Sequence, residues 1–147
     1  KWELEWWQLG QEYHRGMQNL ACDLNRLYRN TPALHDLDFQ PDGFSWIDCN
    51  DAEHSVLSYQ RRARDGSVAI VALNLTPVPR KNYRIGLPAQ MQYREALNSD
   101  SQYYAGSNIG NAGLIQAEPT PWMGLPCSAV ISLPPLAGVI LVPEVAP

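Results

Sequence analysis

The stretch Val68-Ala-Ile-Val-Ala-Leu-Asn-Leu-Thr-Pro-Val-Pro-Arg80 organises the rest of this 147-residue chain. Its first eight residues include one strongly polar side chain, Asn74, and β-branched residues recur among them, as is typical of a strand buried on both faces. Asp65-Gly66 supplies a turn signal before it, and Pro77 and Pro79 close it because proline cannot donate to a sheet ladder. The stretch therefore predicts a central strand of a β domain.

Other short apolar segments, separated by turn residues, surround this strand on both sides. The loop over residues 98–113 is rich in Ser, Asn, Gly and Asp, which favour turns over regular structure. About eight short strands at this spacing predict an antiparallel β-sandwich of Greek-key type. The other expected strands cover residues 44–49, 55–63, 83–87, 93–97, 114–117, 129–133 and 138–142.

Residues 11–30 have the periodicity of an amphipathic helix that precedes the sandwich. Asn30-Thr31-Pro32 ends the pattern, and Gly16 weakens its middle by about 1 kcal/mol. The apolar positions follow the three-and-four spacing of a single stripe, which we expect to be buried. They are Tyr13, Met17, Leu20, Ala21, Leu24, Leu27 and Tyr28.

The first ten residues hold three of the five tryptophans, Trp2, Trp6 and Trp7. Three interpretations are open: the indoles pack on this domain's own core, they face a neighbouring domain, or one of them stacks on a sugar. The chain also begins at Lys1 rather than at Met, inside this segment. We therefore expect it to be a piece of a longer protein.

Composition argues against several classes of partner. A net charge of −4 and a pI near 5.2 argue against nucleic acid and anionic membrane surfaces, both of which call for a basic footprint. The longest late apolar run, residues 136–142, is too short to cross a bilayer. Cys22, Cys49 and Cys127 are odd in number and follow no pattern, which favours reduced thiols in a cytoplasmic protein over a disulfide framework.

The sequence contains no convincing metal, nucleophile or cofactor motif. His14, His35 and His54 lack the paired spacing of a zinc site, and a solvated turn accounts for His35 beside Asp36 and Asp38. No nucleophile elbow and no phosphate-binding glycine loop occur. Asn74-Leu75-Thr76 matches a glycosylation sequon, but its place in a buried strand before Pro77 favours chance. We expect neither metal nor cofactor.

Two groups of carboxylates remain as an acid/base pair for cleaving a glycosidic bond: Asp36 with Asp38, and Asp48 with Asp51 and Glu53. Both groups lie in polar segments, where little would desolvate a carboxylate and raise its pKa. Solvated caps and turns are therefore the favoured interpretation. The residues alone predict a β domain without assigning its function.

Several segments, in order and over nearly the whole chain, resemble the C-terminal end of bacterial 1,4-α-glucan (glycogen) branching enzymes, members of the α-amylase superfamily. Leu75 and Ala105 depart from the family's usual Phe and Gly, and Trp6-Trp7-Gln8-Leu9 is a shortened form of its opening stretch. The segments carrying the resemblance are residues 14–18 (HRGMQ), 23–29 (DLNRLYR), 43–48 (GFSWID), 74–80 (NLTPVPR), 83–86 (YRIG), 97–101 (LNSDS), 106–111 (GSNIGN) and 133–136 (LPPL).

The resemblance implies two parts: residues 1–40 as the end of a catalytic (β/α)8 barrel with its last helix, and residues 41–147 as an all-β C-terminal domain. The family transfers an α-1,4-glucan segment to an α-1,6 branch point by a retaining mechanism in glycogen biosynthesis. Its catalytic carboxylates lie on barrel strands upstream of Lys1, so no catalytic residue is expected here. The expected partner of this non-catalytic domain is the parent barrel, which it would stabilise.

Two other functions stay open at this stage. One is an autonomous carbohydrate-binding module for α-glucans, and the other is a free-standing hydrolase that uses the carboxylates of residues 48–53. A glucan contact would use exposed aromatic residues, for which the candidates are Trp6, Tyr103, Tyr104 and Trp122. We also expect the face bearing Trp2, Trp6, Trp7 and Tyr13 to be exposed without the barrel, so that the fragment self-associates or frays there.

Overall fold

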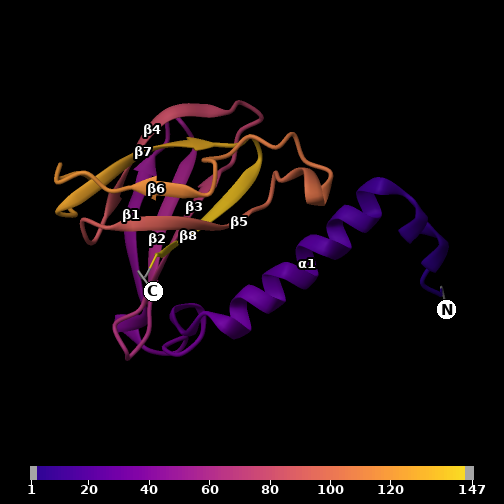
Figure 1. Ribbon diagram of the computed structural model, residues 1–147, viewed down its shortest axis with the longest axis horizontal. Coiled ribbons are helices and arrows are strands. Elements are labelled where there is room, and N and C mark those ends of the chain that lie inside the picture. Colours follow the sequence, from indigo (N-terminus) through magenta and orange to yellow (C-terminus); the bar gives the residue numbers. More distant parts are fainter. Residues whose placement is uncertain (1–2, 145–147) are drawn as a thin grey trace.

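The computed structural model describes residues 3–144 and shows a long helix beside a β-sandwich (Figure 1). A 3₁₀ turn, η1 (Trp6–Gly10), leads into α1 (Glu12–Asn30), which confirms the helix predicted over residues 11–30. Pro32 then starts the short turn η2 (Pro32–Leu34), because its fixed φ suits the first position of a helical turn. Trp2 lies outside the described residues.

The apolar stripe of α1 is not buried as a unit within this chain, which corrects the expectation of a single buried stripe. Gly16 is buried and Leu20, Asp23 and Leu27 are half-buried, so these four positions form the face that meets the β domain. Because an α-helix completes one turn every 3.6 residues, the remaining apolar positions fall on the neighbouring face of the helix. That face projects away from the sheets. Its exposed members are Tyr13, Met17, Ala21, Leu24 and Tyr28.

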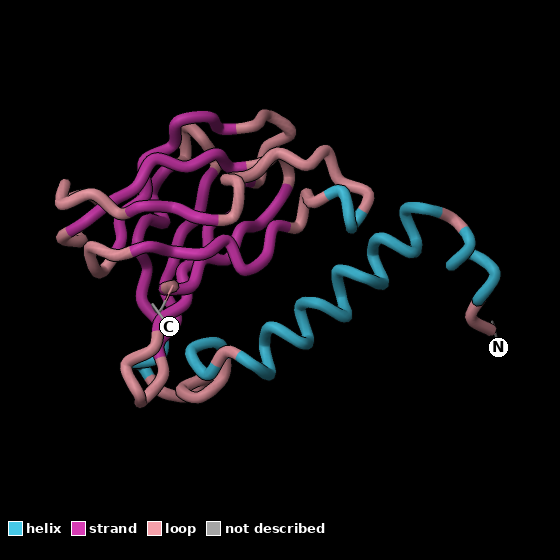
Figure 2. The backbone as a smooth tube through the Cα atoms, in the orientation of Figure 1, coloured by secondary structure: helices cyan, strands magenta, loops and turns pink. Residues whose placement is uncertain are grey.

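Residues 3–144 contain eight strands in two antiparallel sheets, coloured magenta in Figure 2, which confirms the predicted sandwich. The helical turns η3 (Pro41–Gly43) and η4 (Gln102–Tyr104) lie in the connections before β1 and after β5. The smaller sheet pairs β4 (Arg80–Leu87) with β7 (Cys127–Leu133). The larger sheet has the order β1 (Phe44–Asp51), β2 (Val56–Arg62), β3 (Val68–Asn74), β8 (Ala137–Pro143), β5 (Gln92–Asn98), β6 (Leu114–Gln116).

Strand β3 is central, as its sequence predicts. It lies between β2 and β8, and Ala69 to Ala72 are buried in succession because both faces of the sheet are covered there. The turn before it contains Gly66 with a φ of +85°, a conformation that glycine adopts without steric cost. The run of apolar residues therefore identifies the middle of the sheet.

The main core lies between the two sheets and includes the fully buried side chains of Ile70, Ile85, Tyr93 and Leu141. Strands β5, β6, β7 and β8 form the predicted Greek key. Strand β8 returns to pair with β5, β6 pairs with β5 on its other side, and the segment after β6 reaches β7 through a Glu118–Ser128 bridge.

Two tyrosine–aspartate contacts hold α1 against the β domain. The Tyr104 hydroxyl after β5 donates to Asp23 Oδ2 at 2.9 Å, and the Tyr28 hydroxyl donates to Asp38 Oδ2 at 2.9 Å. Asp38 in turn pairs with Arg61 of β2. These contacts fix the C-terminal half of the helix to the sandwich, while its N-terminal end reaches past the sheets (Figure 1).

Candidate functional site

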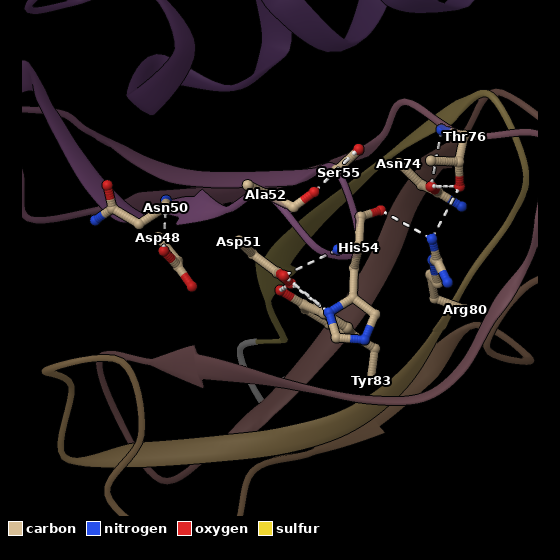
Figure 3. Close-up of polar contacts among 10 residues, drawn as sticks. All are labelled: Asp48, Asn50, Asp51, Ala52, His54, Ser55, Asn74, Thr76, Arg80 and Tyr83. Atoms are coloured by element: carbon tan, nitrogen blue, oxygen red, sulfur yellow. Dashed lines mark hydrogen bonds and ion pairs between the residues drawn. The ribbon is translucent and has the colours of Figure 1, made fainter.

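A polar cleft of about 640 Å³ lies between the end of β1, the start of β4 and the connection from β6 to β7. It is the candidate for ligand chemistry in the β domain, because it combines charged groups with an aromatic ring. Figure 3 shows the polar contacts along one of its walls. The lining residues are Asp48, Asn50, Asp51, His54, Pro79, Arg80, Lys81, Asn82, Tyr83, Arg84, Trp122 and Met123.

Asp51 is the centre of the hydrogen bonds in this wall. The turn after β1 brings His54 back onto it: the His54 backbone N–H donates to Asp51 Oδ1 at 3.1 Å, and His54 Nδ1 lies 2.8 Å from the same oxygen. From β4, the Tyr83 hydroxyl donates to Asp51 Oδ2 at 2.9 Å (Figure 3). The Asp51 side chain is 14% exposed, so these donors replace most of its water.

The electrostatics of this cluster favour a structural carboxylate over a catalytic acid. Burial on its own would raise the pKa of Asp51, but the hydrogen bonds from His54 and Tyr83 outweigh it and lower that pKa. Burial, with the Asp51 contact, raises the pKa of Tyr83. Asp51 is therefore ionised at neutral pH and holds no proton to donate to a glycosidic oxygen.

The other two carboxylates of residues 48–53 lie outside this hydrogen-bonded cluster, and Glu53 is exposed in the turn after β1. Asp48 Oδ1 accepts the backbone N–H of Asn50 at 2.8 Å, and Figure 3 shows its carboxylate apart from that of Asp51. The sequence-based expectation of solvated turns holds for Asp48. Asp51 also closes a turn, by accepting the His54 backbone N–H, but its side chain is only 14% exposed, because the Tyr83 hydroxyl reaches it from a strand 32 residues further along the chain.

Arg80 fixes the opposite end of this wall through hydrogen bonds. Its guanidinium donates to the His54 carbonyl at 3.1 Å and to Thr76 Oγ1 at 3.4 Å, and its Nε is buried without a partner. Asn74 is buried, with its amide donating to the Val78 and Pro134 carbonyls at 2.8 and 2.9 Å. The sequon asparagine thus holds the strand end in place.

Trp122 lies on the rim of the cleft and is 46% exposed. A tight turn presents it, in which the Trp122 and Leu125 backbone groups hydrogen-bond to each other at 3.0 and 2.9 Å. A half-exposed indole beside cationic and amide side chains can offer a sugar both a stacking face and hydrogen-bonding groups. Among the four aromatic residues proposed from sequence for a glucan contact, Trp122 alone lines this cleft.

The other three aromatic candidates lie elsewhere. Tyr103 and Tyr104 belong to η4, beside α1 and away from the β6–β7 connection in Figure 1. Tyr103 is 75% exposed, whereas the Tyr104 hydroxyl is engaged by Asp23. Trp6 is exposed in η1 at the far end of α1. The structure therefore does not gather the four residues into one platform.

The second candidate surface is the exposed face of α1 and η1, which we call the helix face. Trp6, Trp7 and Tyr13 are 68%, 67% and 75% exposed, which confirms the expectation that this side is open. Soluble domains seldom leave so many large apolar side chains together in water. The helix face comprises Trp6, Trp7, Tyr13, Met17, Leu24 and Tyr28, whose side chain stays 46% exposed although its hydroxyl donates to Asp38.

The remaining candidates from sequence have structural roles. Asp36 accepts the Arg64 backbone N–H at 2.9 Å, and Asp38 is shared by Tyr28 and Arg61. Within residues 3–144, no three His, Cys, Asp or Glu side chains are placed to hold a metal ion. Cys22 and Cys49 are exposed thiols, Cys127 is a buried one, and no helix in this range is long and apolar enough to span a membrane.

The sequence offers only a partial signal for these contacts. Asp51-x-x-His54 has the spacing of a side-chain-closed turn, which local pattern can indicate. Its bond to Tyr83, and the link from Tyr28 through Asp38 to Arg61, depend on how β4 and β2 pack in three dimensions.

Comparison with known proteins identifies relatives over nearly the whole chain. The family described as "Alpha amylase, C-terminal all-beta domain" matches residues 46–144. The chain is 60% identical over 139 residues to the 1,4-alpha-glucan branching enzyme GlgB of Nitrosomonas europaea, and 59% identical over 140 residues to that of Nitrosomonas eutropha. It is 49% identical over 138 residues to the GlgB of Cellvibrio japonicus. These matches cover 94–95% of this chain and 19% of each relative, so the chain spans about a fifth of their length.

Proposed function

The chain belongs to the family of alpha-amylase C-terminal all-beta domains, and from this membership we propose that it is the non-catalytic C-terminal domain of a 1,4-α-glucan branching enzyme. In this proposal the parent enzyme transfers an α-1,4-glucan segment to an α-1,6 branch point in glycogen biosynthesis. The reactive carboxylates belong to a catalytic barrel, and this chain stabilises that barrel. The likeness to three GlgB enzymes over 94–95% of the chain supports the assignment.

The helix face is the observation that carries the proposal. It presents Tyr13 and Met17, 75% and 65% exposed, on the side of α1 that the sandwich leaves uncovered. Burying a side chain of this size stabilises a fold by about 1.5–3 kcal/mol. A barrel that covers the helix face would bury several such side chains, and each of them would contribute a stabilisation of this size.

We propose the division of the chain on the same basis. Residues 1–40 are the end of the barrel, with α1 as its last helix, and residues 41–147 are the all-β domain. Tyr104 and Arg61 hold α1 from the sandwich side, through Asp23 and Asp38. The helix is therefore shared between the two bodies, and the sandwich sets its orientation against the barrel.

The chemistry of the polar cleft supports a non-catalytic role. Its most buried carboxylate, Asp51, has a lowered pKa and accepts hydrogen bonds from two side chains. A retaining glycosidase needs one carboxylic acid with a raised pKa beside a second carboxylate. Asp51 and Asp48 do not meet that description.

A charge introduced on the helix face of the full-length branching enzyme tests the proposal. Met17→Glu places a carboxylate in the proposed contact with the barrel, where an unpaired buried charge costs about 3–5 kcal/mol. Gln18→Glu adds the same charge at the next position, outside the helix face, and is the matched control. We expect Met17→Glu alone to lower the melting temperature of the enzyme; equal melting temperatures for the two variants would refute the docking role.

A glucan contact on this domain is a second proposed function, favoured by the position of Trp122. The aromatic candidates are Trp6, Tyr103, Tyr104 and Trp122. Trp122 borders the polar cleft described above, whereas Tyr103 and Tyr104 border a second cleft lined by Glu95, Asn98, Asn108 and Asn111. Titration of maltoheptaose into the chain, followed by tryptophan fluorescence, separates the possibilities. Saturation at micromolar sugar would favour an autonomous carbohydrate-binding module, and no response below millimolar sugar would leave the structural role alone.

Two further properties follow from the same proposal. We place the protein in the cytoplasm, in keeping with its three free and unpatterned cysteines. The chain separated from its barrel would associate with itself through Trp6, Trp7 and Tyr13, because these large apolar side chains are otherwise exposed to water. Sedimentation equilibrium of the chain measures that association directly.

A further inference from the structure

A second apolar surface lies on the larger sheet, at the opposite edge from α1. Phe44 and Trp46 of β1 and Tyr59 of β2, here called the aromatic cluster, have ring centroids 5.0, 5.2 and 6.0 Å apart in their three pairings. Trp46 is 52% exposed and Phe44 is also exposed. Three rings that pack on one another and still face water form a patch that a partner would cover.

The aromatic cluster lies on the same face of the sheet as the elements that precede β1. Side chains alternate across a strand, and Ile47 points into the core between the sheets, so Trp46 points outward. Ala69 of β3 and Val142 of β8 also point outward, where Ala33 of η2 covers them. The helical segment and the aromatic cluster therefore share the outer face of the sheet.

A row of apolar side chains connects the two across the strands. The register aligns Trp46 with Tyr59, Tyr59 with Val71, and Val71 with Ile140. Strand β8, which holds Ile140, pairs with β5, and α1 contacts β5. The outer face thus runs from α1 to the edge strand, and at its middle, where Ala69 and Val71 are buried, this chain already covers it. The side chain of Phe39, in the connection between them, is fully exposed as well.

From this shared face we infer that the aromatic cluster is a second docking surface for the catalytic barrel, so that the barrel contacts the outer face at both α1 and β1. The inference rests on the proposed function, because it takes the parent barrel as the occupant. The relatives supply the size that is needed, since this chain spans 19% of their length. A body several times larger can reach both surfaces.

Two other occupants fit the surface less well. A sugar site needs free polar groups beside its rings, whereas the nearby Arg61 donates to the Gly43 carbonyl and pairs with Asp38. A second copy pairing edge to edge with β1 would need a regular strand. The register of β1 shifts after Trp46 and again after Asp48, and such irregularity protects edges from pairing.

Site-specific photo-crosslinking in the full-length branching enzyme tests the inference. The photoreactive residue p-benzoylphenylalanine replaces Trp46 in one variant and Phe44 in a second, which guards against a folding defect at either site. Met17→p-benzoylphenylalanine reports on the helix face. Val130→p-benzoylphenylalanine is the control, because Val130 of β7 is exposed between the buried Ala129 and Ile131, on the outer side of the other sheet. Each variant is irradiated with and without labelled maltoheptaose, and the crosslinked peptides are identified by mass spectrometry.

We expect positions 46 and 44 to crosslink to peptides of the barrel and position 130 to give no such product. Crosslinks from 46 and 44 to maltoheptaose, to a second copy, or to nothing would overturn the inference. If position 17 still reaches the barrel in that case, the proposed function stands without it. If position 17 also gives no crosslink to the barrel, the proposed function is refuted as well. Crosslinks to the barrel from position 46 but not from position 17 would place the interface on the sheet instead of the helix.

Discussion

A Cβ atom added to Gly16 of α1 would lie 2.4 Å from the carbonyl oxygen of Tyr104, closer than such atoms approach in folded proteins. Gly16 is the buried residue of a helix that is otherwise exposed or half-exposed. The close approach brings the Tyr104 hydroxyl within 2.9 Å of Asp23, about two turns further along the same helix. The helix therefore packs closely against the sandwich at Gly16.

Gly16→Ala is expected to destabilise the contact between α1 and η4. Alanine would stabilise an isolated helix by about 1 kcal/mol, but forcing a methyl group against a backbone carbonyl costs about 1–3 kcal/mol. Gly10→Ala is the control, since an added Cβ there meets no atom within 4 Å. Hydrogen exchange should be faster in α1 of Gly16→Ala and unchanged in Gly10→Ala; slower exchange in Gly16→Ala would mean that helix propensity dominates.

Tyr104→Phe is expected to remove a stabilising contribution that depends on alkaline pH. Burial, with the hydrogen bond to Asp23, raises the pKa of Tyr104 to about 12. A raised pKa means that the contribution is complete below about pH 10 and is lost as the pH rises toward 12. The free energy of unfolding should therefore differ between wild type and Tyr104→Phe by about 1 kcal/mol at pH 8, and less at pH 12. A difference that is constant over this range would show that the hydroxyl titrates normally.

Much of the fold could be predicted from sequence, because it depends on local patterns. The apolar run Val68–Asn74, the Asp65-Gly66 turn and the periodicity of residues 11–30 each produce the element they predict. The division of the helical stripe could not be predicted, because Tyr13 and Leu20 are both apolar and both fit the spacing. Which of them faces the sandwich depends on the position of η4, whose Tyr104 lies 81 residues further along the chain than its partner Asp23.

The candidate sites were less predictable than the fold for the same reason. Trp122 is recognisable as an aromatic residue in a proline-rich connection, but its place beside Arg80 and Tyr83 depends on the packing of three segments. The aromatic cluster combines Phe44 and Trp46, two residues apart, with Tyr59 across the β1–β2 ladder. Alternation within one strand indicates the first pair, and the strand register supplies the third ring.

Asp51→Asn is expected to reduce stability in a way that disappears at acid pH. Hydrogen bonds from His54 and Tyr83 overcome the effect of burial and lower the pKa of Asp51. A lowered pKa means that the ionised carboxylate stabilises the fold above about pH 4, and that this contribution is lost as the pH falls below that value. Urea unfolding at pH 7 and at pH 3 measures the change. Glu53→Gln, at a residue that takes no part in these contacts, should show no such pH dependence, and equal behaviour of the two variants would argue against the Asp51 cluster.

Trp122→Ala is expected to weaken any binding of maltoheptaose to the β domain by about tenfold, which corresponds to about 1.4 kcal/mol. The indole is the half-exposed aromatic side chain on the rim of the polar cleft. Trp7→Ala removes an equally large exposed ring from the helix face and serves as the control. Isothermal titration calorimetry compares the two. Loss of binding in Trp7→Ala with retention in Trp122→Ala would locate the sugar on the helix instead.

Hydroxyl-radical footprinting of Tyr13 and Met17 tests most directly whether α1 is held between the sandwich and a barrel. Both side chains face water in this chain, so they should be oxidised rapidly in the separate chain and be strongly protected in the full-length branching enzyme. Tyr103, 75% exposed on η4, is an internal reference within the same protein. Equal oxidation of Tyr13 and Met17 in the two proteins would contradict the account.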